Sequence, residues 1–378
     1  MLRIDETIPS RLVFNMTSSI EKDINFRWGN ISEIILNEYS QKNILAFIDI
    51  NVYEASDVWS KLEEKHPNFT LIPTNLTESS KQVKSLLSCL ERIENVGLSR
   101  RGDILLAIGG GVLLDLISLA ANLYRRGVSV IKVPTTLLGF VDASVGIKTG
   151  VNYLGQRNRL GSYYLDYNVI YDCSLLTTIN VDLVREGLGE IYKIAIIKSK
   201  ELFELLERHS EKITSPKFYQ TEVGNRIISL SIQLMLEELH DNPTETTLKR
   251  CVDFGHSFSP LVEMKSLTSD DIPEIPHGIA VGADCVITSI IAYNRGILDK
   301  KSLNRIIKIA QTINFLPDHP LYKRNDIMWS SLVDMTTHRA GNQNLPIPTE
   351  IGKFTFLQDI TYDEMSIATK KFISLSES

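Results

Sequence analysis

The stretch Leu105–Asp115, LLAIGGGVLLD, connects an apolar run to a helix-like stretch through three consecutive glycines. Ile104–Ile108 predicts a buried parallel strand, and Val112–Leu123 carries apolar residues at helical spacing. Glycines at a strand-to-helix turn let the backbone approach a phosphate, which the free N–H groups and positive dipole end of the helix then bind. The stretch therefore predicts a nucleotide phosphate at Gly109–Val112, although a tight turn without a ligand has the same pattern.

Further apolar runs alternate with helix-like stretches on both sides of this turn. Ile44–Ile50 and Val128–Val133 have β character, Thr70–Pro73 predicts a shorter strand, and Tyr53–Lys65 predicts a helix. Strands that alternate with helices predict a parallel, doubly wound sheet, which binds ligands at the carboxyl ends of its strands. Thr135 and Thr136 close one such strand and are expected at this crevice.

The second half of the chain has a different character. From about Thr177 the helical periodicity dominates, with few β-branched runs between the helical segments. These segments are Val181–Glu207, Glu222–Leu239, Ile279–Arg295 and Lys301–Thr312. The expected fold is therefore α/β, with a Rossmann-like parallel-sheet domain over residues 1–175 and an all-helical domain over residues 176–378.

Length, charge and cysteine content limit the class of protein. A chain of 378 residues exceeds what one core usually serves, so two domains are expected. A net charge of −6 argues against a nucleic-acid surface or a polybasic membrane contact, while leaving small anions as ligands. The four cysteines are scattered, and neither a signal-like apolar core nor a membrane-spanning stretch occurs. We expect a cytoplasmic protein without nucleic-acid or membrane partners.

Polar residues gather in two segments of the first half. In TESSK, Glu78 suits ribose hydroxyls and Lys81 suits a phosphate, although a capping turn before a solvated helix face explains the same residues. In Val133–Asn158, cationic and amide side chains alternate with apolar ones, at spacings that a single amphipathic helix does not explain. Such groups suit a phosphate and a polyhydroxylated substrate. The polar members of this second segment are Asp142, Lys148, Asn152, Arg157 and Asn158, with Arg159 next.

One carboxylate and two imidazoles in the second half predict a metal site. Glu190 and Lys193 are three residues apart and share a helical face, which by itself is typical of a surface ion pair. His256 and His277 each lie beside a glycine in an apolar frame, where a single histidine is usually a core residue. Taken together, Glu190, His256 and His277 form a catalytic zinc set that leaves a position for a substrate oxygen.

Five motifs in order, GGGVLLD, PTTLLGFVDASVGIKTGVN, GEIYK, FGHSF and PHGIAVG, resemble the sugar phosphate cyclase superfamily, to which 3-dehydroquinate synthase belongs. The resemblance runs from Glu78 to about Pro348 and implies an NAD-binding α/β domain, a helical metal-binding domain, an active site between them and a homodimer. It implies that Glu190, His256 and His277 are the metal ligands, with zinc or alternatively cobalt as the metal.

The resemblance also implies which residues contact substrate and cofactor. The residues expected at the substrate are Lys148, Lys193, Asp253, Asn158, Arg157, Asn152, Lys249 and His338, with Arg126 reaching the phosphate from the neighbouring subunit. The residues expected at NAD are Asp49, Glu78, Lys81, Gly109, Gly110, Gly111, Val112, Asp115, Thr135, Thr136, Leu138, Asp142 and Lys148.

The chain departs from the pattern of 3-dehydroquinate synthase at groups that bind a carboxylate. Asp253 replaces an asparagine, Pro260 replaces a histidine, and Met235 lies near the place of a lysine. These changes indicate a hydroxyl-rich substrate without a carboxylate. MLEEL, VDFGHSFSP, NRLG and HRAGNQNLPIPT resemble the branch that cyclises sedoheptulose 7-phosphate, and Leu239 favours 2-epi-5-epi-valiolone as the product.

The implied reaction oxidises the substrate with NAD⁺, eliminates phosphate, returns the hydride and closes a carbocycle by an aldol step. The alternatives are a 2-epi-valiolone or desmethyl-4-deoxygadusol synthase, 3-dehydroquinate synthase itself, and an oxidoreductase resembling glycerol dehydrogenase. A non-catalytic NAD-binding protein is a further alternative, which retention of all three implied metal ligands disfavours.

Overall fold

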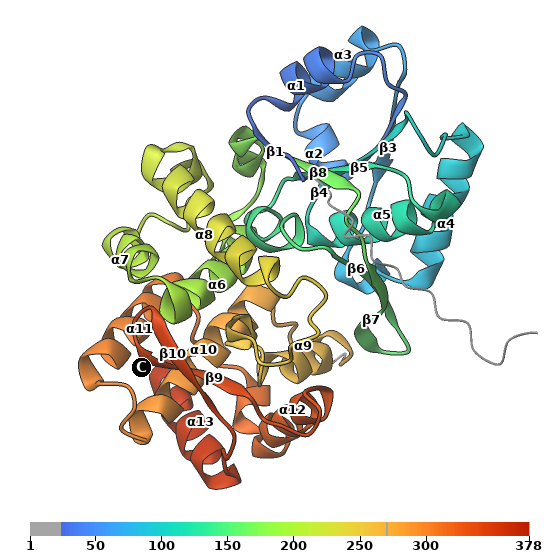
Figure 1. Ribbon diagram of the computed structural model, residues 1–378. Helices are drawn as coiled ribbons and strands as arrows, with labels where there is room; N and C mark the ends of the chain where they lie inside the picture. The colour runs from blue at the N-terminus through green and yellow to red at the C-terminus, as the bar shows by residue number, and fades with distance from the viewer. Residues whose placement is uncertain (1–23, 270, 378) are drawn as a thin grey trace, which may run out of the picture.

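The computed structural model describes residues 24–269 and 271–377. Its first half is built on a six-stranded sheet in the order β1-β8-β5-β4-β2-β3, and each neighbouring pair runs parallel (Figure 1). The strands are β1 Phe26–Trp28, β2 Ile44–Asp49, β3 Phe69–Thr74, β4 Ile104–Gly109, β5 Val130–Pro134 and β8 Tyr167–Tyr171. The predicted parallel sheet is confirmed.

Both faces of the sheet are buried, which explains the continuous apolar runs of the central strands. Leu45 and Phe47 of β2 belong to one core, while Ile44, Ala46 and Ile48 belong to a second core on the opposite face. The first core includes residues of α4 and α5, and the second includes residues of α1, α2 and α3. The helices of this half are α1 Ile31–Glu38, α2 Ile50–Glu54, α3 Val58–Lys65, α4 Val83–Val96 and α5 Gly111–Leu123.

The region expected to be one helix over Tyr53–Lys65 is two helices. Asp49 ends β2 and caps α2, because its Oδ1 accepts a hydrogen bond from the Asn51 N–H at 2.9 Å. Helix α2 ends at Glu54, and α3 begins at Val58. The periodicity therefore predicted the helical state of this region but not its interruption.

The polar segment Val133–Asn158 forms a turn followed by a β-hairpin. A π-helical turn covers Gly139–Ala143, and strands β6 Lys148–Tyr153 and β7 Gln156–Tyr163 pair antiparallel. Leu154 and Gly155 connect the strands with φ values of 48° and 72°. Two left-handed residues suit the tightest hairpin turns. The expectation that no single helix explains this segment agrees with the structure.

The second half is predominantly helical (Figure 1). Its helices are α6 Val181–Lys198, α7 Lys200–His209, α8 Glu222–His240, α9 Ser259–Leu267, α10 His277–Asn294, α11 Lys300–Ile313, α12 Asn325–His338 and α13 Tyr362–Ser376. The helix expected over Val181–Glu207 is divided at Ser199, whose extended backbone ends α6 and whose hydroxyl caps α7 through the Leu202 N–H.

An antiparallel hairpin corrects the description of this half as all-helical. Strands β9 Leu345–Glu350 and β10 Lys353–Leu357 pair around Gly352, which has a φ of 84°. The first four residues of β9, Leu345–Pro348, are all buried, and Leu345 and Ile347 belong to the same apolar core as residues of α10 and α13. Two prolines among the six residues of β9 argue against a strand when only the sequence is considered. The α/β class, with a parallel-sheet half followed by a helical half, is otherwise confirmed.

One apolar core joins the two halves. It extends from Leu45 and Phe47 in the sheet to Met365 and Phe372 in α13, through the buried faces of α5, α6 and α10. Among the described residues, no helix is long and apolar enough to cross a membrane.

A buried lysine fixes the turn that precedes the β6–β7 hairpin. Lys132 of β5 is 1% exposed, and its Nζ donates to the carbonyl oxygens of Ala143 at 3.1 Å and Gly146 at 2.9 Å. The ammonium lies 4.0 Å from the centre of the Tyr167 ring. Burial lowers the pKa of Lys132 from 10.5 to about 8.

This pKa predicts how stability depends on pH. Below about pH 8 the lysine is charged in both the folded and unfolded states, and the cost of burying the charge is fully present. Between pH 8 and 10.5 only the unfolded state retains the proton, so the free energy of unfolding rises with pH, by up to about 3 kcal/mol. The free energy of unfolding of wild type minus that of Lys132→Met, measured with urea across this pH range, should therefore rise with pH. A flat difference contradicts the prediction.

Candidate active site

The three predicted metal ligands meet at the junction of α6, α9 and α10. Glu190 lies in α6, His277 begins α10, and His256 precedes α9. Glu190 Oε1 lies 3.2 Å from His277 Nε2 and 3.4 Å from His256 Nε2, and one ligand atom from each residue lies within 4.8 Å of the others. Tetrahedral zinc with bonds of about 2.0–2.1 Å places ligand atoms about 3.3 Å apart, so the donor set and its spacing fit zinc.

Two glycines allow the helices that carry these ligands to touch. Gly189 precedes Glu190, and Gly278 follows His277. A Cβ on Gly189 would overlap the backbone of Gly278, and a Cβ on Gly278 would overlap the backbone of Glu186. The contact of α6 with α10 therefore depends on glycine at both positions, and it determines how far apart Glu190 and His277 lie.

Asp284 holds the chain that follows His256. Its buried Oδ2 accepts hydrogen bonds from the backbone N–H groups of Ser257 at 2.8 Å, Phe258 at 2.6 Å and Ser259 at 3.0 Å. Asp284 lies two turns after His277 on α10. A single helix therefore supplies one ligand and fixes the segment that carries another.

The charges around the ligands keep the carboxylate ionised. Burial favours the neutral form of Glu190, but Lys193, whose Nζ contacts Glu190 Oε2, and His256 hold the pKa of that carboxyl well below its usual value. Burial acts on Lys193 in the opposite direction to the charges of Glu190 and Asp142, which together raise the pKa of its ammonium. A metal ligand must be deprotonated, so this arrangement favours metal binding at Glu190.

A second carboxylate, which the sequence did not indicate, lies behind His277. Glu263 of α9 is 6% exposed, and its Oε2 lies 3.0 Å from His277 Nδ1. Arg157 of β7 contacts the same Oε2 through Nη1 and lies 3.3 Å from His277 Nδ1. Burial lowers the pKa of His277, but Glu263 and Glu190 together outweigh it and raise this pKa to about 10. The only signal in the sequence was an acidic residue within the apolar frame of SPLVEMKSL.

The glycine turn lies where the strand order of the sheet reverses. From β2 the chain moves outward to β3, and β4 then returns to the other side of β2. Parallel sheets bind nucleotides at such a switch point, outside the carboxyl ends of the strands. Asp49 ends β2 and Gly109 ends β4, so both lie at this crevice. Helix α5 begins at Gly111 without a side-chain cap, which leaves its first N–H groups available for a phosphate.

The remaining predicted contacts of the turn surround it. The Thr135 N–H donates to the Gly109 carbonyl at 3.0 Å, and a Cβ on Gly110 would lie 3.2 Å from Thr136 Cγ2. Leu138 directly precedes the Gly139–Ala143 turn that contains Asp142. Because Gly110 and Gly111 carry no side chain, a pyrophosphate could approach the backbone here. The turn therefore fits NAD.

A polar network connects the TESSK segment to the hairpin. Lys81 is 3% exposed, and its Nζ donates to Asp115 Oδ2 at 2.6 Å and Asn158 Oδ1 at 2.7 Å. Asn152 donates through Nδ2 to Glu78 Oε1 at 2.9 Å and accepts from the Asn158 N–H at 2.8 Å. Thr77 and Ser80 do form a capping box, but burial of Lys81 excludes a fully solvated face. The capping turn of TESSK is therefore confirmed, while the contacts of Glu78 and Lys81 with a nucleotide stay a prediction.

Asp253 is enclosed by two arginines. Arg250 Nη2 donates to Asp253 Oδ1 at 2.6 Å, and Arg339 Nε lies 3.3 Å from Oδ2. Arg339 is 3% exposed and donates through Nη1 to the Gln343 carbonyl. Its neighbour His338 instead lies half-exposed beside Asp334 at 3.5 Å. The structure therefore brings Arg339, rather than His338, to Asp253.

Among the described residues, three other predicted residues form no hydrogen bond or ion pair with the metal ligands. Lys148 is exposed and forms an ion pair with Glu245, and Lys249 lies with Nζ 4.8 Å from the centre of the Phe356 ring. Arg126 is exposed in the turn Tyr124–Arg126, where its φ is 64°.

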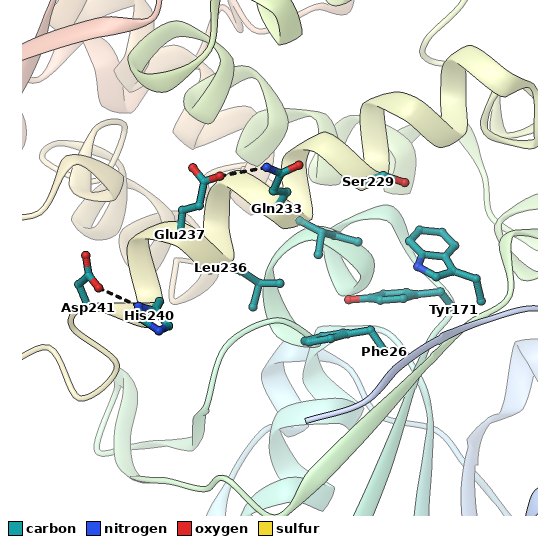
Figure 2. Close-up of a pocket in the computed structure, with 10 residues that line it drawn as sticks. Phe26, Tyr171, Ser229, Gln233, Leu236, Glu237, His240 and Asp241 are labelled. Atoms are coloured by element: carbon teal, nitrogen blue, oxygen red, sulfur yellow. Dashed lines mark hydrogen bonds and ion pairs between the residues drawn. The ribbon is translucent and has the colours of Figure 1, made fainter. Parts of the chain in front are cut away.

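A cavity of about 630 Å³ lies elsewhere, between strands β1 and β8 and helix α8 (Figure 2). The rings of Phe26 and Tyr171 face Leu236 and His240 across it, and Trp28 also lines it. None of the residues predicted for the site lines this cavity.

Two family models match this chain, and both describe parts of the same enzyme. The family model described as 3-dehydroquinate synthase N-terminal matches residues 71–186, and the model described as 3-dehydroquinate synthase C-terminal matches residues 187–334. The chain belongs to the 3-dehydroquinate synthase family. The chain is similar to three relatives that are named as sugar phosphate cyclases.

Two of these relatives are named 2-epi-5-epi-valiolone synthase. The protein from Streptomyces albus is 37% identical over 334 residues, covering 87% of this chain and 80% of the relative. The protein from an Actinoplanes species is 42% identical over 277 residues, covering 72% of this chain and 68% of the relative. The third is a solved structure, ValA (2-epi-5-epi-valiolone synthase) from Streptomyces hygroscopicus subsp. jinggangensis 5008, with NAD⁺ and Zn²⁺ bound. It superposes with a TM-score of 0.88 at 34% identity and covers 96% of this chain and 99% of that chain.

Proposed function

We propose that the protein is an NAD- and zinc-dependent sugar phosphate cyclase that converts sedoheptulose 7-phosphate to 2-epi-5-epi-valiolone and releases phosphate. The observation that carries the proposal is that Glu190, His256 and His277 converge, with Glu190 Oε1 separated from each imidazole by about the edge of a tetrahedral zinc site. The glycine turn at the switch point of the sheet supplies the NAD site. Relatives of 37% and 42% identity carry the name of this activity.

The choice of substrate is supported by the groups around Asp253. The carboxylate of Asp253, which pairs with Arg250 and Arg339, could still accept hydrogen bonds from sugar hydroxyls, but it offers no donor to a substrate carboxylate. Pro260 offers no side-chain donor. These features disfavour the heptulosonate substrate of 3-dehydroquinate synthase. The alternative activities are those of the 2-epi-valiolone and desmethyl-4-deoxygadusol synthases, which use the same class of substrate.

Bound NAD⁺ would accept and return a hydride, and bound zinc would polarise substrate hydroxyl oxygens. Glu190, His256 and His277 would hold the metal, while the ammonium of Lys193 stabilises negative charge that develops on neighbouring oxygens. Arg157 and Asn152 would orient the phosphate and hydroxyl groups from the hairpin. Lys148, now paired with Glu245, would turn toward the phosphate when the substrate is present.

We also propose that the protein is a homodimer, that it has two domains and that it lies in the cytoplasm. Exposed apolar side chains of the hairpin, including Leu154, Leu160 and Tyr163, support a homodimer in which Arg126 reaches the partner's substrate phosphate. The boundary near residues 175 and 176 divides a cofactor-binding domain from a metal-binding domain. The four cysteines form no disulfide in the structure, which supports a cytoplasmic location.

The proposed reaction predicts phosphate release without net reduction of the cofactor. The zinc-loaded protein, incubated with sedoheptulose 7-phosphate and NAD⁺, should release phosphate over many turnovers while absorbance at the NADH wavelength stays flat. NMR of the product distinguishes 2-epi-5-epi-valiolone from its two alternatives. Steady NADH formation indicates an oxidoreductase resembling glycerol dehydrogenase, and phosphate release only from the heptulosonate phosphate indicates 3-dehydroquinate synthase.

A further inference from the structure

Glu263 occupies a position that connects the metal ligands to the hairpin. Its carboxylate lies 3.1 Å and 3.0 Å from His277 Nδ1 through its two oxygens, on the side of the ring opposite to Nε2. Nε2 in turn lies 3.2 Å from Glu190 Oε1. The two nitrogens of His277 therefore face different carboxylates, one from the predicted metal ligand and one from a residue outside the ligand set.

We propose that Glu263 is a positioning residue that makes His277 a competent zinc ligand. When Nδ1–H donates to Glu263, the lone pair of Nε2 is left for the metal, and the ring is held in the plane that points this lone pair at the site. The proposal rests on the proposed zinc-dependent function, and it concerns a residue that has no role there.

The surroundings of Glu263 explain how a buried carboxylate is maintained behind the ligand. Glu263 is 6% exposed, and an unpaired buried charge is costly. Arg157 contacts Glu263 Oε2 and also lies 3.6 Å from Glu78 Oε1, so its guanidinium is held between two carboxylates. The backbone carbonyl of Glu263 accepts from Ser266 Oγ at 2.8 Å, which helps to fix its turn of α9. Arg157 therefore compensates the charge that Glu263 presents to His277.

The proposal can be tested by measuring zinc binding alone, without any substrate. Zinc affinity of metal-free protein is measured by competition with a chromophoric chelator for wild type, Glu263→Gln and Glu207→Gln. Glu207 is the matched control, because its carboxylate also pairs with an arginine, Arg305, but does not contact the ligands. We expect Glu263→Gln to weaken zinc binding by about 10–100-fold. Glu207→Gln should remain within about 2-fold of wild type.

Two further readouts distinguish positioning from a general effect on folding. NAD⁺ affinity of Glu263→Gln should match wild type, and the visible spectrum of the cobalt-substituted variant should change because the ligand ring is no longer held. If Glu263→Gln does not fold, Glu263→Asp retains the charge one carbon farther away and should bind zinc with intermediate affinity. Wild-type zinc affinity in these variants overturns the proposal, as does an equal loss of zinc and NAD⁺ binding. Failure of wild type itself to bind zinc would instead refute the proposed function.

Discussion

Glu190→Gln is expected to abolish the cyclase activity. The amide removes the only anionic group among the three predicted ligands and leaves the buried ammonium of Lys193 without its partner. Lewis-acid stabilisation by a metal contributes several kcal/mol to a transition state, so kcat/KM should fall by about 10³-fold or more. Bound zinc, measured by elemental analysis after dialysis, should fall with it.

Two companion variants make this result specific. His256→Ala removes a neutral ligand without leaving Lys193 unpaired, and it should also lose both zinc and phosphate release. Glu201→Gln alters an exposed carboxylate that pairs with Arg226 on the surface, and it should behave as wild type. Glu190→Gln protein that retains stoichiometric zinc and turns over normally would contradict the ligand assignment.

Gly278→Ala is expected to cause the second large effect, through packing rather than chemistry. The added methyl group would overlap the backbone of Glu186, where no side chain can move aside. Overpacking of a core costs about 1–3 kcal/mol when side chains can adjust, and a clash with backbone belongs at the upper end or beyond. Zinc affinity should also fall, because His277 precedes the displaced residue.

The measurement is urea unfolding combined with zinc titration. Gly146→Ala is the matched control, since a Cβ there meets only Asp142 O at 3.7 Å and Lys148 N at 3.9 Å. That control should lose less than about 1 kcal/mol of stability. A similar small loss for Gly278→Ala would show that α6 and α10 can separate without cost.

The features that the sequence predicted well are those encoded locally. The buried strand of Ile104–Ile108 and the helix after it follow from an apolar run and from helical spacing, and both agree closely with β4 and α5. Interruptions were harder to predict, because Ser199 ends one helix and caps the next while the apolar pattern continues across it. The β9–β10 hairpin was missed because two prolines among the six residues of β9 argue against a strand.

The candidate site also contains some residues that the sequence indicated and others that only tertiary packing brings together. Its metal set could be assembled from residue types alone, since a carboxylate and two imidazoles in apolar surroundings are chemically distinctive. Glu263 could not be predicted, because its partners Arg157 and His277 are 106 and 14 residues away and meet it only through tertiary packing. Asp284 is similar, since its three backbone partners lie 25–27 residues away. Contacts of this kind depend on how helices pack.

The apolar core that runs from Leu45 in β2 to Phe372 in α13 has a consequence for exchanging parts between relatives. The halves share this core as well as ion pairs such as Arg157–Glu263, so a chimaera would join two surfaces that are shaped for different neighbours. The crossover with the fewest new mismatches would therefore exchange elements outside this core and keep α5, α6 and α10 from one parent. Substrate preference in this scaffold is thus better altered by changes outside the shared core than by exchanging whole halves.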